Sequence, residues 1–263
     1  MMGVRTIQSG GNRNMSDQEL IKKVRAALEV DPHVNTHHDE FHIHTEGSVV
    51  TLGGTVADII EKRRAVIAAS KVDGVREVID ELRVKPAEPM GQDQCLQHVR
   101  DALYEEPAFC DYRLVAVNHK DEREIVRDPA EAAGEIIMVV EEDNRVVLGG
   151  QVRSLSHRRL AEVLSWWVPG STDVKNDLEV VPPEEDNDGE ILDAVELALE
   201  KDHMVNPADM TVGCKDAVVT LRGGIPTGVQ KRFAEYDAWY VNGVVDVINE
   251  LVPVDPADLH EGA

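Results

Sequence analysis

The chain repeats one pattern of residues three times, and this repetition constrains its fold more than any other feature. A leucine stands in each of three valine-rich runs, and a glycine follows each leucine after 22 residues. The leucine–glycine pairs are Leu52 and Gly74, Leu148 and Gly170, and Leu221 and Gly243. Identical spacing in three places predicts three copies of one structural unit rather than one large domain.

Each copy is predicted to contain two helices and three strands. Apolar residues recur at helical spacing ahead of each valine-rich run, in three sets: Leu20, Val24, Ala27 and Leu28; Leu96, Val99, Ala102 and Leu103; Ile191, Val195, Ala198 and Leu199. The marker glycines are expected to end a second helix with positive φ. Third strands are predicted over 75–84, 172–181 and 244–252. The expected fold class is α+β, with three tandem α-β-β-α-β units, each of two helices packed on a three-stranded sheet.

Proline-rich and acidic stretches separate the units and predict extended linkers. The predicted boundaries are a disordered tail over 1–15, repeats over 16–85, 92–182 and 188–254, and a second tail over 255–263. The middle unit needs 49 residues from its helix valine to its strand leucine, against 28 and 26 in the other units. We expect this insertion, about 111–134, to be a solvated excursion or a partner-binding arm.

Charge excludes some classes of protein. The chain has 50 Asp and Glu against 27 Lys and Arg, a net charge of −23. Such a surface disfavours nucleic acid and argues against a polybasic contact with anionic lipid. The sequence shows no nucleophile or nucleotide-binding motif, so we expect no enzyme activity and no cofactor.

The ends of the chain and its cysteines bear on its location. The three cysteines are an odd number at wide spacing, typical of thiols in a reducing compartment. No run approaches the ~20 apolar residues of a membrane span, and the first residues lack the apolar core of a signal peptide. A cytoplasmic location is therefore expected, or a periplasmic one if a signal has been removed.

The repeated motif resembles the BON domain, a family named for bacterial osmotically inducible and nodulation proteins. The resemblance runs through Val49 to Leu82, with Val72-Asp73-Gly74-Val75 at its centre, and through Val241-Asn242-Gly243-Val244 in the third unit. The middle unit departs from it at Val168-Pro169-Gly170-Ser171-Thr172. The resemblance implies a non-enzymatic binding module. It links such modules to phospholipid membranes and envelope stress, and in some cases to the sensing of small ligands or potassium.

One group of histidines is a candidate metal site. His42 and His44 lie two apart on a predicted strand, so their side chains share one face, and His38 is near in sequence. Two or three imidazoles suit Zn²⁺ or Ni²⁺. The alternative is a polar, outward strand face opposite Phe41 and Ile43.

The second helices of the last two units carry an additional apolar stripe. Its candidate interface or binding residues are aromatic, and they are Trp166, Trp167, Phe233, Tyr236, Trp239 and Tyr240. A unit of this size cannot bury two stripes alone. We expect units two and three to bury them against each other or in a homo-oligomer. The alternative is an exposed aromatic surface that contacts lipid or a partner.

Three functions remain open at this stage. The first, implied by the resemblance, is stress- or envelope-associated binding of a phospholipid or membrane surface, most plausibly around Trp166 and Trp167. The second is a sensor of a cation, potassium or calcium, or of a small ligand, which requires oxygen ligands converging at a junction between units. The third is a protein-interaction scaffold.

Overall fold

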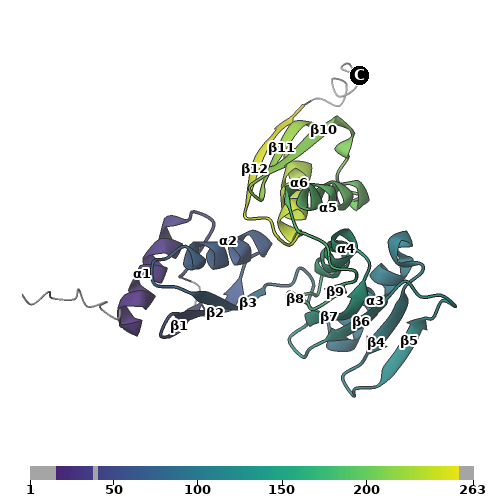
Figure 1. Cartoon of the computed structure of the whole chain (residues 1–263). Helices are drawn as coiled ribbons and strands as arrows, with labels where there is room; N and C mark the ends of the chain where they lie inside the picture. The colour runs from purple at the N-terminus through teal and green to yellow at the C-terminus, as the bar shows by residue number, and fades with distance from the viewer. Residues whose placement is uncertain (1–15, 38–40, 255–263) are drawn as a thin grey trace, which may run out of the picture.

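The computed structural model describes residues 16–37 and 41–254 and folds them into three α+β units that follow one another along the chain (Figure 1). The first unit contains α1 (Asp17–Val30), β1 (His42–Glu46), β2 (Val49–Val56), α2 (Ile59–Ser70) and β3 (Glu77–Val84). Its sheet has the order β1-β2-β3, antiparallel between β1 and β2 and parallel between β2 and β3. The α-β-β-α-β order predicted from the sequence is confirmed.

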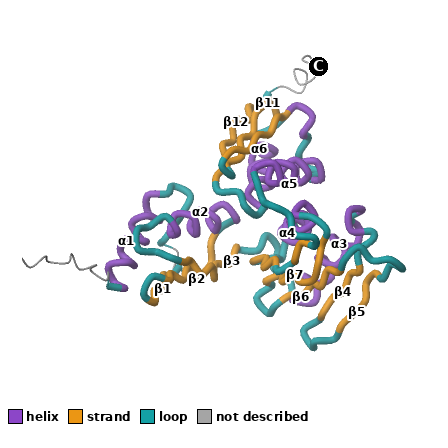
Figure 2. The backbone as a smooth tube through the Cα atoms, viewed as in Figure 1, coloured by secondary structure: helices purple, strands orange, loops and turns teal. Residues whose placement is uncertain are grey.

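The third unit repeats the first element for element, as the helices and strands in Figure 2 show. It contains α5 (Asp188–Lys201), a short 3₁₀ turn η2 (Pro207–Asp209), β10 (Met210–Lys215), β11 (Val218–Ile225), α6 (Gly228–Tyr240) and β12 (Asp246–Pro253). Its sheet order, β10-β11-β12, has the same antiparallel and parallel pairings.

The middle unit has the same plan with a wider sheet. It contains α3 (Gln92–Glu105), η1 (Pro107–Phe109), β4 (Arg113–Val117), β5 (Arg123–Arg127), β6 (Glu135–Val140), β7 (Arg145–Val152), α4 (Leu155–Trp166), β8 (Asp173–Asn176) and β9 (Glu179–Val180). Its strands lie in the order β5-β4-β6-β7-β8, and β9 also pairs with β7.

The insertion in the middle unit forms part of the sheet, which corrects the prediction of a solvated excursion; a partner-binding role for it stays a prediction. β4 pairs in parallel with β6, and β5 closes an antiparallel hairpin on β4. Four consecutive residues of β4, Leu114 to Val117, are buried. Because successive strand residues point to opposite faces, β4 is covered on both faces. The apolar run of the insertion therefore widens the core.

Two of the three marker glycines act as predicted, and the third does not. Gly74 and Gly243 both have φ of 103° and follow the second helices of their units. Gly170 has no such φ, so the prediction of a positive-φ helix stop is wrong there. A Cβ at this position would overlap the flexible side chain of Met90, which would have to move aside. The glycine therefore makes room for Met90 rather than providing a positive φ.

The apolar residues form two cores rather than three. Leu20, Val24 and Leu52 belong to a core confined to the first repeat. A second, continuous core runs through the middle and third repeats, from α3 and β6 to α6 and β12, and also takes in Ile59 from α2 of the first repeat. The second and third repeats are therefore packed as one body, and the first repeat is attached to it.

A buried carboxylate joins the first repeat to the second. Asp173, 5% exposed, lies 3.1 Å from Lys62 Nζ, 3.4 Å from Arg83 Nη1 and 3.1 Å from Arg145 Nε. Lys62 is itself 2% exposed, so its ammonium depends on acidic partners. One backbone hydrogen bond, from Val84 N to Thr172 O at 2.7 Å, runs beside these ion pairs.

Asp173→Asn should weaken the attachment of the first repeat. The amide keeps the shape of the side chain and removes one of the two carboxylates beside the buried Lys62 ammonium. Lys62 keeps Asp80 at 2.9 Å, so the cost should lie below the about 3–5 kcal/mol of a buried charge left unpaired. Urea denaturation should show a lower midpoint for the transition of the first repeat. Asp177→Asn, at an exposed pair with Lys175, is the matched control and should stay within about 0.5 kcal/mol of wild type. Equal midpoints for both variants would contradict the assignment.

Candidate ligand site at the junction of the repeats

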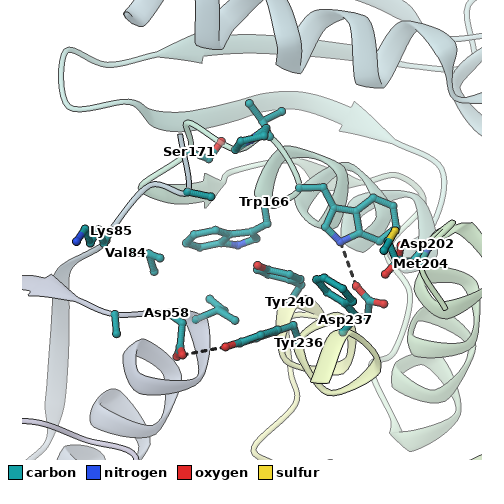
Figure 3. A pocket seen from close by; sticks show the side chains of 17 residues that line it. Asp58, Val84, Lys85, Trp166, Ser171, Asp202, Met204, Tyr236, Asp237 and Tyr240 are labelled. Carbon is teal, nitrogen blue, oxygen red and sulfur yellow. Dashed lines mark hydrogen bonds between the residues drawn. The ribbon is translucent and has the colours of Figure 1, made fainter. Parts of the chain in front are cut away.

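All three repeats line one cavity of about 500 Å³ (Figure 3). The first repeat contributes the start of α2 and the end of β3, the second the end of α4 and the turn after it, and the third the end of α5 and one face of α6. Five aromatic side chains form much of its wall, and they are Trp166, Trp167, Phe233, Tyr236 and Tyr240. Its charged residues are Asp58, Asp202, Asp237 and Lys85.

Local structure places the aromatic rings. Trp166 is the last residue of α4, and Trp167 caps that helix. Phe233, Tyr236 and Tyr240 stand three and four residues apart on α6, so they share one face of the helix. The helix ends thus direct rings from two repeats toward the same space.

Contacts between repeats hold these rings in fixed orientations. The rings of Trp166 and Tyr240 stack with centroids 5.9 Å apart and planes 26° apart. Trp167 Nε1 donates to Asp237 Oδ1 at 3.2 Å. Tyr236 Oη donates to Asp58 Oδ2 at 3.1 Å, and this bond links the third repeat to the first. Figure 3 shows both hydrogen bonds on the cavity wall.

Asp237 is the most perturbed carboxyl group in the cavity. Burial is the largest cause of a pKa raised to about 9. The charge of the neighbouring Asp202 carboxylate and a hydrogen bond to it also raise the pKa, and the bond from Trp167 opposes the shift. The residue is 2% exposed, and its carboxyl group is protonated near neutral pH beside the Asp202 carboxylate. Trp166, 6% exposed, has an indole Nε1 without a hydrogen-bond partner among the described residues. The cavity wall therefore includes one buried donor that no acceptor satisfies and one carboxyl group that shares its proton with a second.

The tyrosines of the cavity stay protonated near neutral pH. Burial raises the pKa of Tyr240 strongly, and the Asp237 carboxyl adds to that shift. Burial also raises the pKa of Tyr236, and Asp58 adds to it.

The structure places the six predicted aromatic residues in two different environments. Five line the cavity, whereas Trp239 is 1% exposed and packs in the core below it, with the Arg64 guanidinium 6.0 Å from its ring centre. The stripes of the second and third repeats do meet, as the stacking of Trp166 on Tyr240 shows. The carboxylates and the whole contribution of the first repeat were not predicted from the sequence. One available signal was Asp237, which falls between the core positions Ala234 and Ala238 of an amphipathic helix.

The histidine group does not reach this cavity. His42 and His44 are exposed on β1, on the face opposite Phe41 and Ile43 as predicted, and His44 Nε2 lies 3.5 Å from Glu46 Oε1. Within residues 16–37 and 41–254, no three His, Cys, Asp or Glu side chains are grouped to hold a metal ion. His38 lies outside the described residues, so the metal site that includes it stays a prediction.

The fold defines a protein of tandem α+β repeats, and comparison with known families identifies the repeat. The BON domain model matches residues 16–86, 122–182 and 187–253. The chain belongs to the BON domain family, with three copies in tandem, as the sequence motif predicted. In the part of the chain that the structure describes, no helix has the length and apolarity to cross a membrane.

Similar proteins include one curated relative and one solved structure. Osmotically-inducible protein Y of Escherichia coli (strain K12) is 31% identical over 166 residues, which cover 63% of this chain and 73% of that protein. Among solved structures, the C-terminal domain of CdsD, a structural protein of the type III secretion system of Chlamydia trachomatis, is 16% identical. It covers 91% of this chain and 100% of its own, with a TM-score of 0.23, too low to support a conclusion.

Asp237→Asn should change how stability depends on pH. Between its pKa of 3.8 in the unfolded chain and about 9 in the folded one, Asp237 holds a proton that unfolding releases. The free energy of unfolding therefore falls as pH rises through this window. Asparagine removes this titration, so the variant should lose less stability than wild type between about pH 5 and about pH 9.

Thermal unfolding at a series of pH values measures this effect. The midpoint of the variant should exceed that of wild type by several degrees at the alkaline end, since about 1 kcal/mol moves such a midpoint by ~2–4 °C. Asp177→Asn, at an exposed carboxylate, should follow the wild-type curve. Parallel curves for wild type and Asp237→Asn would show that the buried carboxyl does not titrate in this range.

Proposed function

We propose that this protein is a non-catalytic binding protein that holds a small ligand in the cavity between its three BON repeats. The observation that carries the proposal is a cavity lined by all three repeats, on whose wall Trp166 has a buried indole N–H without an acceptor among the described residues. A buried polar group without a partner costs free energy, and a ligand that bonds to it recovers that cost. A volume of about 500 Å³ falls in the range of small-molecule sites.

The protonation states of the lining residues support binding rather than catalysis. A general acid or base works best with a pKa near the operating pH. Burial and neighbouring carboxylates move the pKa of Tyr236 and Tyr240 upward from an already alkaline value. Asp237, with a pKa of about 9, keeps its proton as well. The cavity is therefore suited to hold a molecule rather than to transfer its protons.

Ligand binding at this site would depend on how the three repeats are arranged. The first repeat has its own core, while the second and third share one. A ligand that contacts all three favours the state in which the first repeat is docked, by its differential affinity for that state. The similarity to osmotically-inducible protein Y supports a role in osmotic stress, in which such a ligand would be the signal.

The phospholipid alternative receives less support from the described surface. The predicted lipid-contacting patch included Trp166 and Trp167, and Trp166 is buried against Tyr240. Phospholipid binding, a scaffold role and the cytoplasmic location remain predictions that these contacts do not test. Flotation of the intact protein with vesicles of anionic and zwitterionic phospholipid separates lipid binding from small-ligand binding.

A cavity-blocking variant tests the proposed function. Ala57 lines the cavity and is exposed, so Ala57→Trp should fill part of it without disturbing a core. A thermal-shift panel of neutral, anionic, zwitterionic and cationic small molecules should identify compounds that stabilise wild type, because a ligand of the folded state raises its stability. Ala57→Trp should weaken every such compound at least tenfold.

The matched control is Ala208→Trp, at an exposed alanine that does not line the cavity. It should bind the same compounds as wild type does. If no compound class stabilises wild type, or if Ala57→Trp binds every compound unchanged, the small-ligand function is wrong.

A further inference from the structure

We propose that the ligand of this cavity is an organic cation, an alkylated ammonium group that carries a hydroxyl or similar hydrogen-bond acceptor a few bonds away. This inference rests on the proposed function and adds the chemical class of the ligand.

The aromatic wall is the first argument. The chain has three Trp, four Tyr and three Phe residues, and five of these line this one cavity. An alkylated ammonium is attracted to the faces of such rings by their quadrupole, while its methyl groups make apolar contacts with them. The rings are held by stacking and by hydrogen bonds, so they form this surface before a ligand arrives.

The charge of the lining is the second argument. Three carboxyl groups, on Asp58, Asp202 and Asp237, face a single cationic residue, Lys85. Lys85 is exposed, and Figure 3 shows it at the side of the cavity away from Asp202 and Asp237. This balance favours a cation and disfavours a phosphate or carboxylate ligand.

The form of the lining favours an organic cation over an inorganic one. Calcium takes six to eight oxygen ligands, whereas aromatic and aliphatic side chains form most of this wall. Asp58 and Asp237 are each engaged by an aromatic donor, Tyr236 and Trp167 respectively. Their oxygens are thus set among rings rather than gathered around one point, which suits a bulky and weakly hydrated cation.

The polar groups of the wall define the rest of the ligand. The Asp202 carboxylate lies beside the protonated Asp237 carboxyl, and a positive charge placed there offsets the repulsion that arises when Asp237 ionises as well. Trp166 Nε1 is a donor without an acceptor, so the ligand needs an oxygen within its reach. Choline has both features and is the simplest probe.

Binding should also release a proton. The groups around Asp237 are the Asp202 carboxylate at the end of α5, Trp167 after α4, and Tyr236 and Tyr240 on its own helix, with Asp58 and Lys85 across the cavity. A cation favours the ionised form of Asp237. Affinity for choline should therefore rise with pH up to about 9, the pKa of the empty site.

Titration calorimetry of the intact protein at constant ionic strength tests the inference with four probes. These are choline, tetramethylammonium, the uncharged choline analogue 3,3-dimethylbutan-1-ol, and K⁺. Choline should bind most tightly, tetramethylammonium more weakly, and the uncharged analogue at least tenfold more weakly than choline. Equal binding of choline and its uncharged analogue overturns the cationic class. So does binding of K⁺ without choline, although the cavity would then still be a ligand site.

Three variants assign the roles of the residues. Trp166→Phe keeps an aromatic ring and removes the N–H, so choline should lose several times more affinity than tetramethylammonium does. Asp202→Asn keeps the Oδ1 that accepts from Met204 N and removes the charge, so both cations should weaken at least tenfold. Asp177→Asn is the surface control and should bind as wild type does.

Failure of this inference is distinguishable from failure of the proposed function. If compounds of another charge class bind to wild type and Ala57→Trp loses them, the cavity is a ligand site and only its cationic class is wrong. If Trp166→Phe binds choline and tetramethylammonium as wild type does, the hydroxyl contact is wrong. Thermal unfolding of each variant shows beforehand whether it is folded.

Discussion

The burial of α4 is the constraint on which the rest of the molecule depends. Nine of its twelve residues are buried, so the helix has almost no solvent face. It packs on α3, β7 and β8 in its own repeat and on α5 and α6 of the third. A module of this size cannot bury a helix all round by itself, because small domains retain too much surface. The third repeat therefore completes the core of the second, and the two behave as one body.

Burying α4 on all sides also buries two of its charges, and these are paired across the repeats. Glu162 accepts from Arg63 of the first repeat at 2.9 Å. Arg159, 3% exposed, donates to Asp186 in the linker at 2.7 Å and to the carbonyl of Asn242 in the third repeat at 2.9 Å. Buried pairs of this kind are weak evidence of net stability, but an unpaired partner is costly. They therefore penalise any docking in which the wrong faces meet.

The internal repeats determined which parts of the fold and of the candidate site could be predicted from the sequence. Identical spacing around Leu52, Leu148 and Leu221 identified the elements, because spacing records the backbone plan. A comparison of equivalent positions on the second helices also identified the aromatic residues. The second and third repeats have apolar side chains where the first has cations, and such side chains need another surface to cover them. The carboxylates of the cavity could not be found in this way. In a chain with 50 acidic residues, only the packing of α5 against α6 distinguishes Asp202 from the rest, whereas Asp237 had one signal in the sequence, its position between the core residues Ala234 and Ala238.

Two predictions were wrong for the same reason: residue type alone does not determine which structural role a residue or segment takes. A glycine can allow either a positive φ or a close contact with the backbone. The sequence does not distinguish Gly170, which makes room for Met90, from Gly74, which has a positive φ. An inserted segment with an apolar run can either project into solvent or pair with a strand of the sheet. The insertion joined because the edge of β6 was open for parallel pairing with β4. Both outcomes depend on neighbours distant in sequence.

The cavity shows how one fold used three times yields a single site. Asp58, Ser154 and Thr227 occupy the same position and all cap the N-terminus of a second helix. Asp58 alone also accepts a hydrogen bond from Tyr236 of another repeat. The capping role requires only a side-chain oxygen, so it leaves the residue type free to vary. The site thus depends on the differences between the repeats, while the fold depends on what they share.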